Sequence, residues 1–247
     1  MIRLSSYSKN TPHNKSAGSF KVALIIIGFF IAGCSTTMQM VVPSDISTAT
    51  DVIPATQRSG WSGSMADETF TLGEYKVTEV DRDWDSSESD TVSINKLALT
   101  SGNTKGAYDF QFKTPNGPMT GKCASGASEE SLGVSGFKVE KKAFSLNCAC
   151  RDGKGEVAKV NVRAQNMNDY TGTLTIQDKH YQVVSLKEVE GALSNGASGY
   201  RVDGDHPVGA VEVLKPGRIW LGKNLKQSEK SALACTFVGL MLYLPPQ

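Results

Sequence analysis

Short runs in which apolar and polar residues alternate recur along the chain from residue 61 onward. In one of them, Tyr108, Phe110 and Phe112 alternate with Asp109 and Gln111. Successive side chains of a β-strand point to opposite faces of a sheet, so this period of two predicts strands with one buried and one solvated face. The other runs with this period lie within residues 144–150, 160–164, 170–176, 181–186, 211–213 and 219–221.

Turn-forming residues separate these predicted strands. Residues 115–118 read Pro-Asn-Gly-Pro, residues 151–155 read Arg-Asp-Gly-Lys-Gly, and residues 215–217 read Lys-Pro-Gly. Gly, Pro, Asn and Asp favour tight turns, and short turns join antiparallel rather than parallel strands. The predicted fold class is therefore mainly β, with an antiparallel sheet that forms a sandwich or a barrel-like structure.

The C-terminal region differs from this pattern. Residues 226–244 lack turn-forming residues except for Gly239, and residues 232–244 are almost entirely apolar. An element that is apolar on all sides is buried, and this run is shorter than the roughly 20 residues that cross a bilayer. We expect one C-terminal helix packed on the sheet, capped by Asn224 and Gln227. A buried strand over residues 237–243 is the alternative.

Charge is distributed unevenly along the chain. Residues 1–33 contain four basic residues and no acidic one, although the net charge of the whole chain is only +1. The remainder is therefore slightly acidic, and it contains no cluster of Lys and Arg interleaved with aromatic residues. Nucleic-acid-binding proteins usually carry such a basic patch, so we expect no nucleic-acid partner.

The N-terminal region has the layout of an export signal, in which a basic segment precedes an apolar run that ends near Ala32. The residues Ile31-Ala32-Gly33-Cys34 resemble the lipobox of bacterial lipoproteins. This resemblance implies cleavage before Cys34, a diacylglycerol thioether on its sulfur, and acylation of the new amino group. Multiple acyl chains would anchor the protein firmly in a bilayer. Because Ser35 rather than Asp follows the cysteine, the resemblance implies sorting to the outer membrane.

These features divide the chain into three expected parts. Residues 1–33 would be a lipoprotein signal peptide, and residues 61–247 a single β-rich domain with the C-terminal helix. Residues 34–60 are rich in Ser, Thr, Ala and Pro and show no sustained periodicity, which predicts a lipidated N-terminus and a flexible tether. The alternative is that Val41-Val42 and Val52-Ile53 form a short docked strand.

Four further cysteines would reach an oxidising compartment, where disulfides form. Cys148 and Cys150 lie two residues apart on one predicted strand face, which makes a bond between them geometrically poor. Each is therefore expected to pair with Cys123 or Cys235, in either order. The alternatives are a zinc site, which the cysteine spacing disfavours, and a free, buried Cys235.

No complete catalytic motif is present, and we predict no catalytic residue, metal or cofactor. The serines at positions 128 and 198 lack the final Gly of a nucleophile elbow. Asp205 and His206 could act as a general base or bind a metal, although turn chemistry alone explains their loop. Residues 81–90 lack the Gly and Glu of a calcium-binding loop, and we expect a solvated acidic loop there.

Three functional hypotheses follow. The first is a non-enzymatic binding or envelope-assembly module, with the lipid bilayer and a protein of the cell envelope as partners. The second is a carrier of a small apolar ligand, because the predicted strands and Gly60-Trp61 resemble the lipocalin barrel, some bacterial members of which are outer-membrane lipoproteins. The lipocalin motif is Gly-x-Trp, however, and here no residue separates Gly60 from Trp61. An envelope hydrolase is the third.

Overall fold

The computed structural model describes residues 38–58, 68–94, 97–134, 137–164, 169–193 and 196–243. The predicted signal peptide, the lipobox with Cys34, and Gly60-Trp61 lie outside these residues. No helix within the described ranges is long and apolar enough to cross a membrane.

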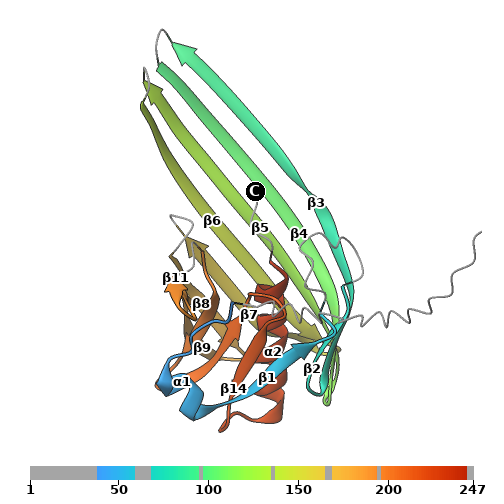
Figure 1. The fold of residues 1–247 in the computed structure, drawn as a ribbon. Coiled ribbons are helices and arrows are strands. Elements are labelled where there is room, and N and C mark those ends of the chain that lie inside the picture. The colour runs from blue at the N-terminus through green and yellow to red at the C-terminus, as the bar shows by residue number, and fades with distance from the viewer. Residues whose placement is uncertain are drawn as a thin grey trace, which may run out of the picture. The chain divides into compact units, whose positions relative to one another are not determined.

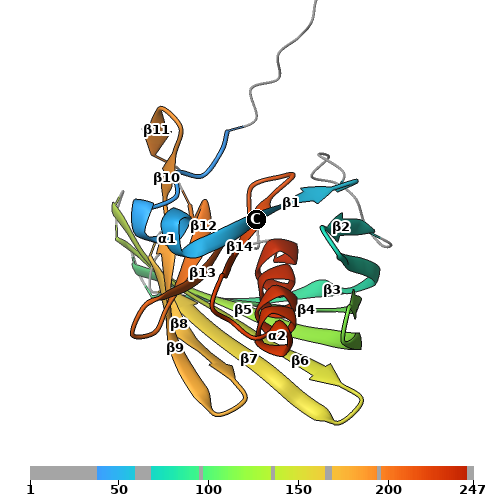
Figure 2. The ribbon, with the colours of Figure 1, turned by 90° about the horizontal axis from the view of Figure 1, so that it is seen from below.

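Twelve antiparallel strands form a closed barrel in the order β1-β14-β13-β12-β9-β8-β7-β6-β5-β4-β3-β2 (Figures 1 and 2). This confirms the prediction of a mainly β fold with an antiparallel sheet, and the sheet is a barrel rather than a sandwich. The strands of the barrel are β1 (Thr50–Thr56), β2 (Phe70–Leu72), β3 (Tyr75–Ile94), β4 (Leu97–Thr114), β5 (Gly117–Val134), β6 (Phe137–Asp152), β7 (Gly155–Ala164), β8 (Tyr170–Ile176), β9 (Lys179–Leu186), β12 (Gly199–Asp203), β13 (Pro207–Glu212) and β14 (Arg218–Gly222). The remaining elements are the hairpin of β10 (Glu188–Val189) and β11 (Ala192–Leu193), and the helices α1 (Ser44–Ala49) and α2 (Gln227–Leu242).

Helix α2 is the predicted C-terminal helix, and it lies inside the ring of strands (Figure 2). Its residues from Ser231 to Leu242 are all buried, which explains why the sequence is apolar on every side of the helix. Groups from opposite walls contact it: Tyr108 of β4 donates a hydrogen bond to Gly239 O at 2.7 Å, and Lys179 of β9 forms an ion pair with Glu229. The helix therefore fills the lumen rather than covering an outer face.

The N-terminus of α2 is not capped by Asn224, so that prediction is wrong. The helix begins at Gln227, and the backbone N–H of Lys226 donates instead to the Glu229 carboxylate at 3.0 Å. Lys179 donates a second hydrogen bond to this carboxylate at 2.6 Å. These bonds, the one from Lys179 foremost, lower the pKa of Glu229, and a negative charge at a helix N-terminus is stabilised by the helix dipole.

The prediction of a flexible tether to residue 60 is wrong for residues 50–56, which form β1. This strand pairs with both β14 and β2, so the barrel could not close without it. Preceding it, α1 packs through Ile46 against Trp220 on the outside of the barrel. The docked-strand alternative was closer, although it left out α1. Only two of the seven residues of β1 are buried. Its apolar and polar residues therefore alternate too weakly for the sequence to predict a strand.

Four strands continue far beyond the barrel. β3 to β6 contain 20, 18, 18 and 16 residues, whereas β7 to β9 contain 10, 7 and 8. The hydrogen-bonding partner of β6 on its other side, β7, begins to pair only at Phe144. We call the extension beyond this point the blade, made of residues 88–94, 97–103, 128–134 and 137–143, which are seven residues from each strand in continuous antiparallel register (Figure 1).

Candidate functional site

The four candidate cysteines form two disulfides, Cys123–Cys148 and Cys150–Cys235. Cys123 and Cys148 are directly opposed in the register of β5 and β6, with Cα atoms 4.1 Å apart. Cys150 lies two residues further along β6 on the same face and reaches Cys235 of α2. The predicted pairing of each β6 cysteine with a different partner is confirmed, the order left open is settled, and neither a zinc site nor a free Cys235 remains.

The remaining residues considered for catalysis or metal binding are not assembled into a site. Asp205 and His206 are exposed in the turn before β13. The Ser198 hydroxyl is buried and donates to the Leu186 carbonyl at 2.9 Å. Within the described residues, no three His, Cys, Asp or Glu side chains are grouped so that they could hold a metal ion.

The acidic segment at residues 81–90 is a strand, not the solvated loop expected from its composition. It is the middle of β3, paired with β4 through two register irregularities between Thr78 and Ser86. Acidic residues disfavour strands, but the pairing with β4, itself embedded in the sheet, overrides this local preference.

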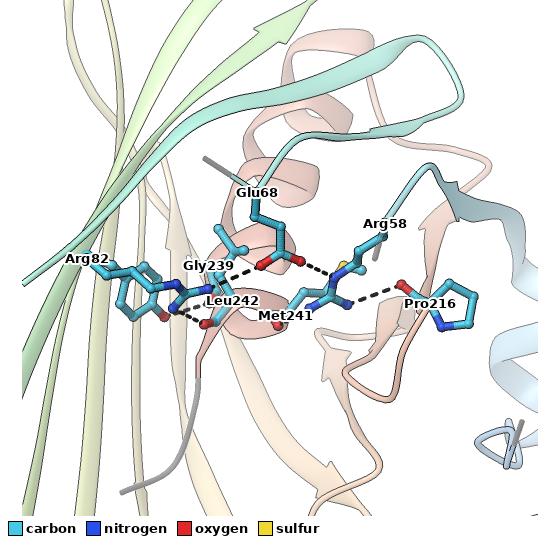
Figure 3. A network of polar contacts seen from close by, with 8 residues as sticks. Arg58, Glu68, Arg82, Pro216, Gly239, Met241 and Leu242 are labelled. Atoms are coloured by element: carbon cyan, nitrogen blue, oxygen red, sulfur yellow. Dashed lines mark hydrogen bonds and ion pairs between the residues drawn. The ribbon is translucent and has the colours of Figure 1, made fainter. Parts of the chain in front are cut away.

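A buried cluster of charged side chains closes the end of the lumen beside the C-terminus of α2 (Figure 3). Arg58 Nε donates to Glu68 at 2.9 Å, and an Arg82 nitrogen lies 3.4 Å from the other Glu68 oxygen. The exposed fractions of the side chains are 2% for Arg58, 6% for Glu68 and 18% for Arg82. One carboxylate therefore bridges two guanidinium groups in a largely water-free place.

The arginines of this cluster also bind the last carbonyls of α2. Arg58 donates to Met241 O at 2.6 Å and to Pro216 O at 3.2 Å, and Arg82 donates to Leu242 O at 2.8 Å. Carbonyls at a helix C-terminus lack partners within the helix and carry partial negative charge. Burial lowers the pKa of Arg58, while its hydrogen bond to Glu68 opposes this effect. The cluster thus fixes the helix end to β3 and to the segments before β2 and β14.

Tyr108 and Gly239 make a further contact between the helix and the wall. Burial raises the pKa of Tyr108 well above its ordinary value, so its hydroxyl remains a proton donor to Gly239 O. A Cβ atom at Gly239 would lie 2.9 Å from Cys148 Sγ and 3.0 Å from Cys123 Sγ. Glycine is therefore required where the helix passes over the first disulfide.

The lumen thus holds structural contacts, whereas a hollow lies on the outer face of the sheet. It is a groove of about 740 Å³ at the base of the blade, where β7 parts from β6. Lys105 and Arg163 are exposed and alternate with residues that face the lumen, which places them on the outer face. The polar residues that line the groove are Asn103, Lys105, Ser128, Ser145, Arg163, Asp169 and Thr171.

The register explains the shape and charge of this groove. Lys105, Gly126, Ser145 and Arg163 are consecutive partners across β4, β5, β6 and β7. Two small residues form the floor between two long cationic side chains. Nearby Asp169 lines the same groove, but it is paired with Lys187. The groove therefore offers two cationic side chains to an acidic segment.

The groove leads onto an unpaired strand edge. Beyond Phe144, residues 137–143 of β6 pair with β5 on one side and with no strand of the described chain on the other. On the opposite side of the blade, β3 pairs with β2 only at residues 75–77, so on one side its residues 78–94 pair with no strand that the structure describes. Unpaired edges present free backbone N–H and C=O groups that can bind another strand.

Sequence analysis missed these features for physical reasons. Arg58, Glu68 and Arg82 form no motif in the sequence, and only closure of the barrel brings them together. The groove arises from the cross-strand register, which cannot be deduced from the separation of Lys105 and Arg163 in the sequence. The one available signal was strand length, because residues 74–94 contain no Gly, Pro or Asn.

Comparison with known proteins adds no assignment: no family model, no curated protein and no solved structure matches this chain.

Proposed function

We propose that this chain is a lipid-anchored lipoprotein of the bacterial outer membrane that acts as a non-enzymatic binding module for a protein of the cell envelope. The observation that carries the binding role is the blade, whose two outer strands each have an edge without a strand neighbour among the described residues. A monomeric protein usually blunts or covers such edges. A long, four-stranded extension with two such edges is therefore best explained by a protein partner.

The contents of the lumen support this role over that of a carrier. A carrier barrel needs an internal cavity of about 300–1,000 Å³ for a small ligand, and α2 occupies that space in the described chain. The closed barrel is compatible with a lipocalin-like carrier, which remains the second candidate. The outer groove is open and carries the cationic side chains of Lys105 and Arg163, as expected for a contact with an acidic protein segment.

The membrane anchor is tested by replacing the cysteine of the lipobox. We expect Cys34→Ser to abolish incorporation of labelled palmitate and to release the protein from outer-membrane fractions of a Gram-negative host, because no acyl chain could be attached. Ser35→Ala serves as the matched control and should leave labelling unchanged. Continued labelling of the Cys34→Ser protein would contradict the anchor.

The binding role is tested by formaldehyde cross-linking in intact cells, followed by immunoblotting. We expect the wild-type chain to form cross-linked species above the monomer mass, and Lys141→Glu, on the free edge of β6, to reduce them strongly. Lys154→Glu makes the same charge change in the exposed turn between β6 and β7 and should have no effect. Equal cross-linking of all three proteins would contradict binding at this edge.

A further inference from the structure

The two free edges of the blade differ in charge. In β3, residues 88–94 contain two acidic residues, Glu88 and Asp90, and no basic residue. In β6, residues 137–143 contain three lysines and one glutamate. Opposite charges on neighbouring strands stabilise a sheet, and like charges destabilise it. An acidic edge and a basic edge on one molecule are therefore complementary to each other between two molecules.

The strand directions are also complementary. β3 runs from the barrel toward the tip of the blade, and β6 runs from the tip back to the barrel. When two copies stand side by side with the same orientation, β3 of one and β6 of the other are antiparallel. The joined blades would then continue one antiparallel sheet without a change of pattern. Pairing of like edges would instead oppose acidic with acidic or lysine with lysine residues.

The register within the blade gives a specific alignment. Ile94, Leu97, Val134 and Phe137 are successive partners across the four strands at the tip. Two residues closer to the barrel along each strand, the successive partners are Val92, Leu99, Leu132 and Val139. Two residues closer again, they are Asp90, Ser101, Glu130 and Lys141. A level alignment of two blades would pair Phe137 with Ile94, Val139 with Val92, and Lys141 with Asp90 of the second copy. This alignment places apolar residues opposite apolar residues, and Lys141 opposite the acidic Asp90 of the second copy.

We propose that the partner of this edge is a second copy of the chain, whose β3 residues 88–94 pair antiparallel with residues 137–143 of the first. This inference rests on the proposed function, since it names the protein that the blade binds. The alignment also brings Glu88 of the second copy opposite Ala143, which lines the cationic groove. Each dimer retains one free edge of each kind, so addition continues until a ring closes or a filament forms.

The test uses the full-length protein, extracted from bacterial membranes in mild detergent and sized by mass photometry over a concentration series. Asp90→Lys and Lys141→Glu each place like charges across the interface, and we expect each to weaken association about tenfold. The double variant, and an equal mixture of the two single variants, restore opposite charges and should regain association. Lys154→Glu is the control with unchanged association.

A carbodiimide, which joins an amine to a carboxylate without a spacer, tests the register directly. In an equal mixture of ¹⁴N- and ¹⁵N-labelled chains, we expect cross-linked peptides that join Lys141 of one isotope to Asp90 of the other. A monomeric wild-type protein at all concentrations, or association that survives both single variants, would overturn the proposal. If that monomer still shows the Lys141-dependent cross-link to another protein in cells, the self-association is wrong and the proposed function stands. If neither the self-association nor the Lys141-dependent cross-link is observed, both the self-association and the proposed function are wrong.

Discussion

Replacing Glu68 with glutamine is expected to lower the free energy of unfolding by about 3 kcal/mol, because removing one partner of a buried ion pair leaves a buried charge without compensation. Arg58 is 2% exposed, and it would then face Arg82 across a neutral amide. The carboxamide keeps the shape of the side chain, so the effect reports the charge rather than a cavity. Because Arg82 is only partly buried, the expected loss of stability lies at the lower end of the range for buried ion pairs.

Urea denaturation without reductant, followed by circular dichroism, measures this change. Glu156→Gln is the matched control, because Glu156 is exposed in β7 and surface substitutions usually change stability by less than about 0.5 kcal/mol. If Glu68→Gln unfolds at the same urea concentration as this control, the cluster does not hold the end of α2 as described.

Removing the disulfide between β6 and α2 is expected to cost more than removing the one between β5 and β6. Cys150–Cys235 closes a loop of sequence separation 85, whereas Cys123–Cys148 spans 25 residues. In the chain-entropy model these loops correspond to about 4.6 and about 3.5 kcal/mol. The longer loop also ties the lumen helix to the wall, so its loss should loosen the packing of α2 in addition to destabilising the whole domain.

The comparison uses two double variants, Cys150→Ala/Cys235→Ala and Cys123→Ala/Cys148→Ala, so that no free thiol is left to mispair. Hydrogen exchange should increase in residues 227–242 in the first variant more than in the second. Addition of a reductant should bring the wild-type protein below both variants in stability. The opposite order of the two variants, or unchanged exchange in α2, would contradict the assigned role of this bond.

The strands that sequence analysis predicted are those whose burial alternates locally. Phe110 and Phe112 are nearly fully buried and alternate with exposed or partly exposed polar residues, and this alternation is present in the sequence before the chain folds. β1 is different, because it carries Pro54 and buries only its first residue and Ala55. Its place between β14 and β2 is fixed by closure of the barrel, which no local pattern encodes.

The position of α2 was only partly predictable. A sheet covers one side of a helix, so a helix that is apolar on all sides requires walls on all sides. The apolar sequence therefore predicted that the helix is buried, but not that it lies inside a barrel. The disulfide order depended on the same closure: the direct opposition of Cys123 and Cys148 in the register leaves Cys150 to reach the helix.

The closeness of Met40 to Cys34 in the sequence limits the reach of the proposed anchor. Met40 is already buried and bridges to Val189, so only residues 35–39 separate it from Cys34. A fully extended chain of this length spans about 20 Å, since each residue adds at most about 3.6 Å. A lipid on Cys34 would hold residue 40 within this distance of the bilayer surface. So short a connection to the lipid would confine all copies to a thin layer at the bilayer surface, where their effective concentration is high.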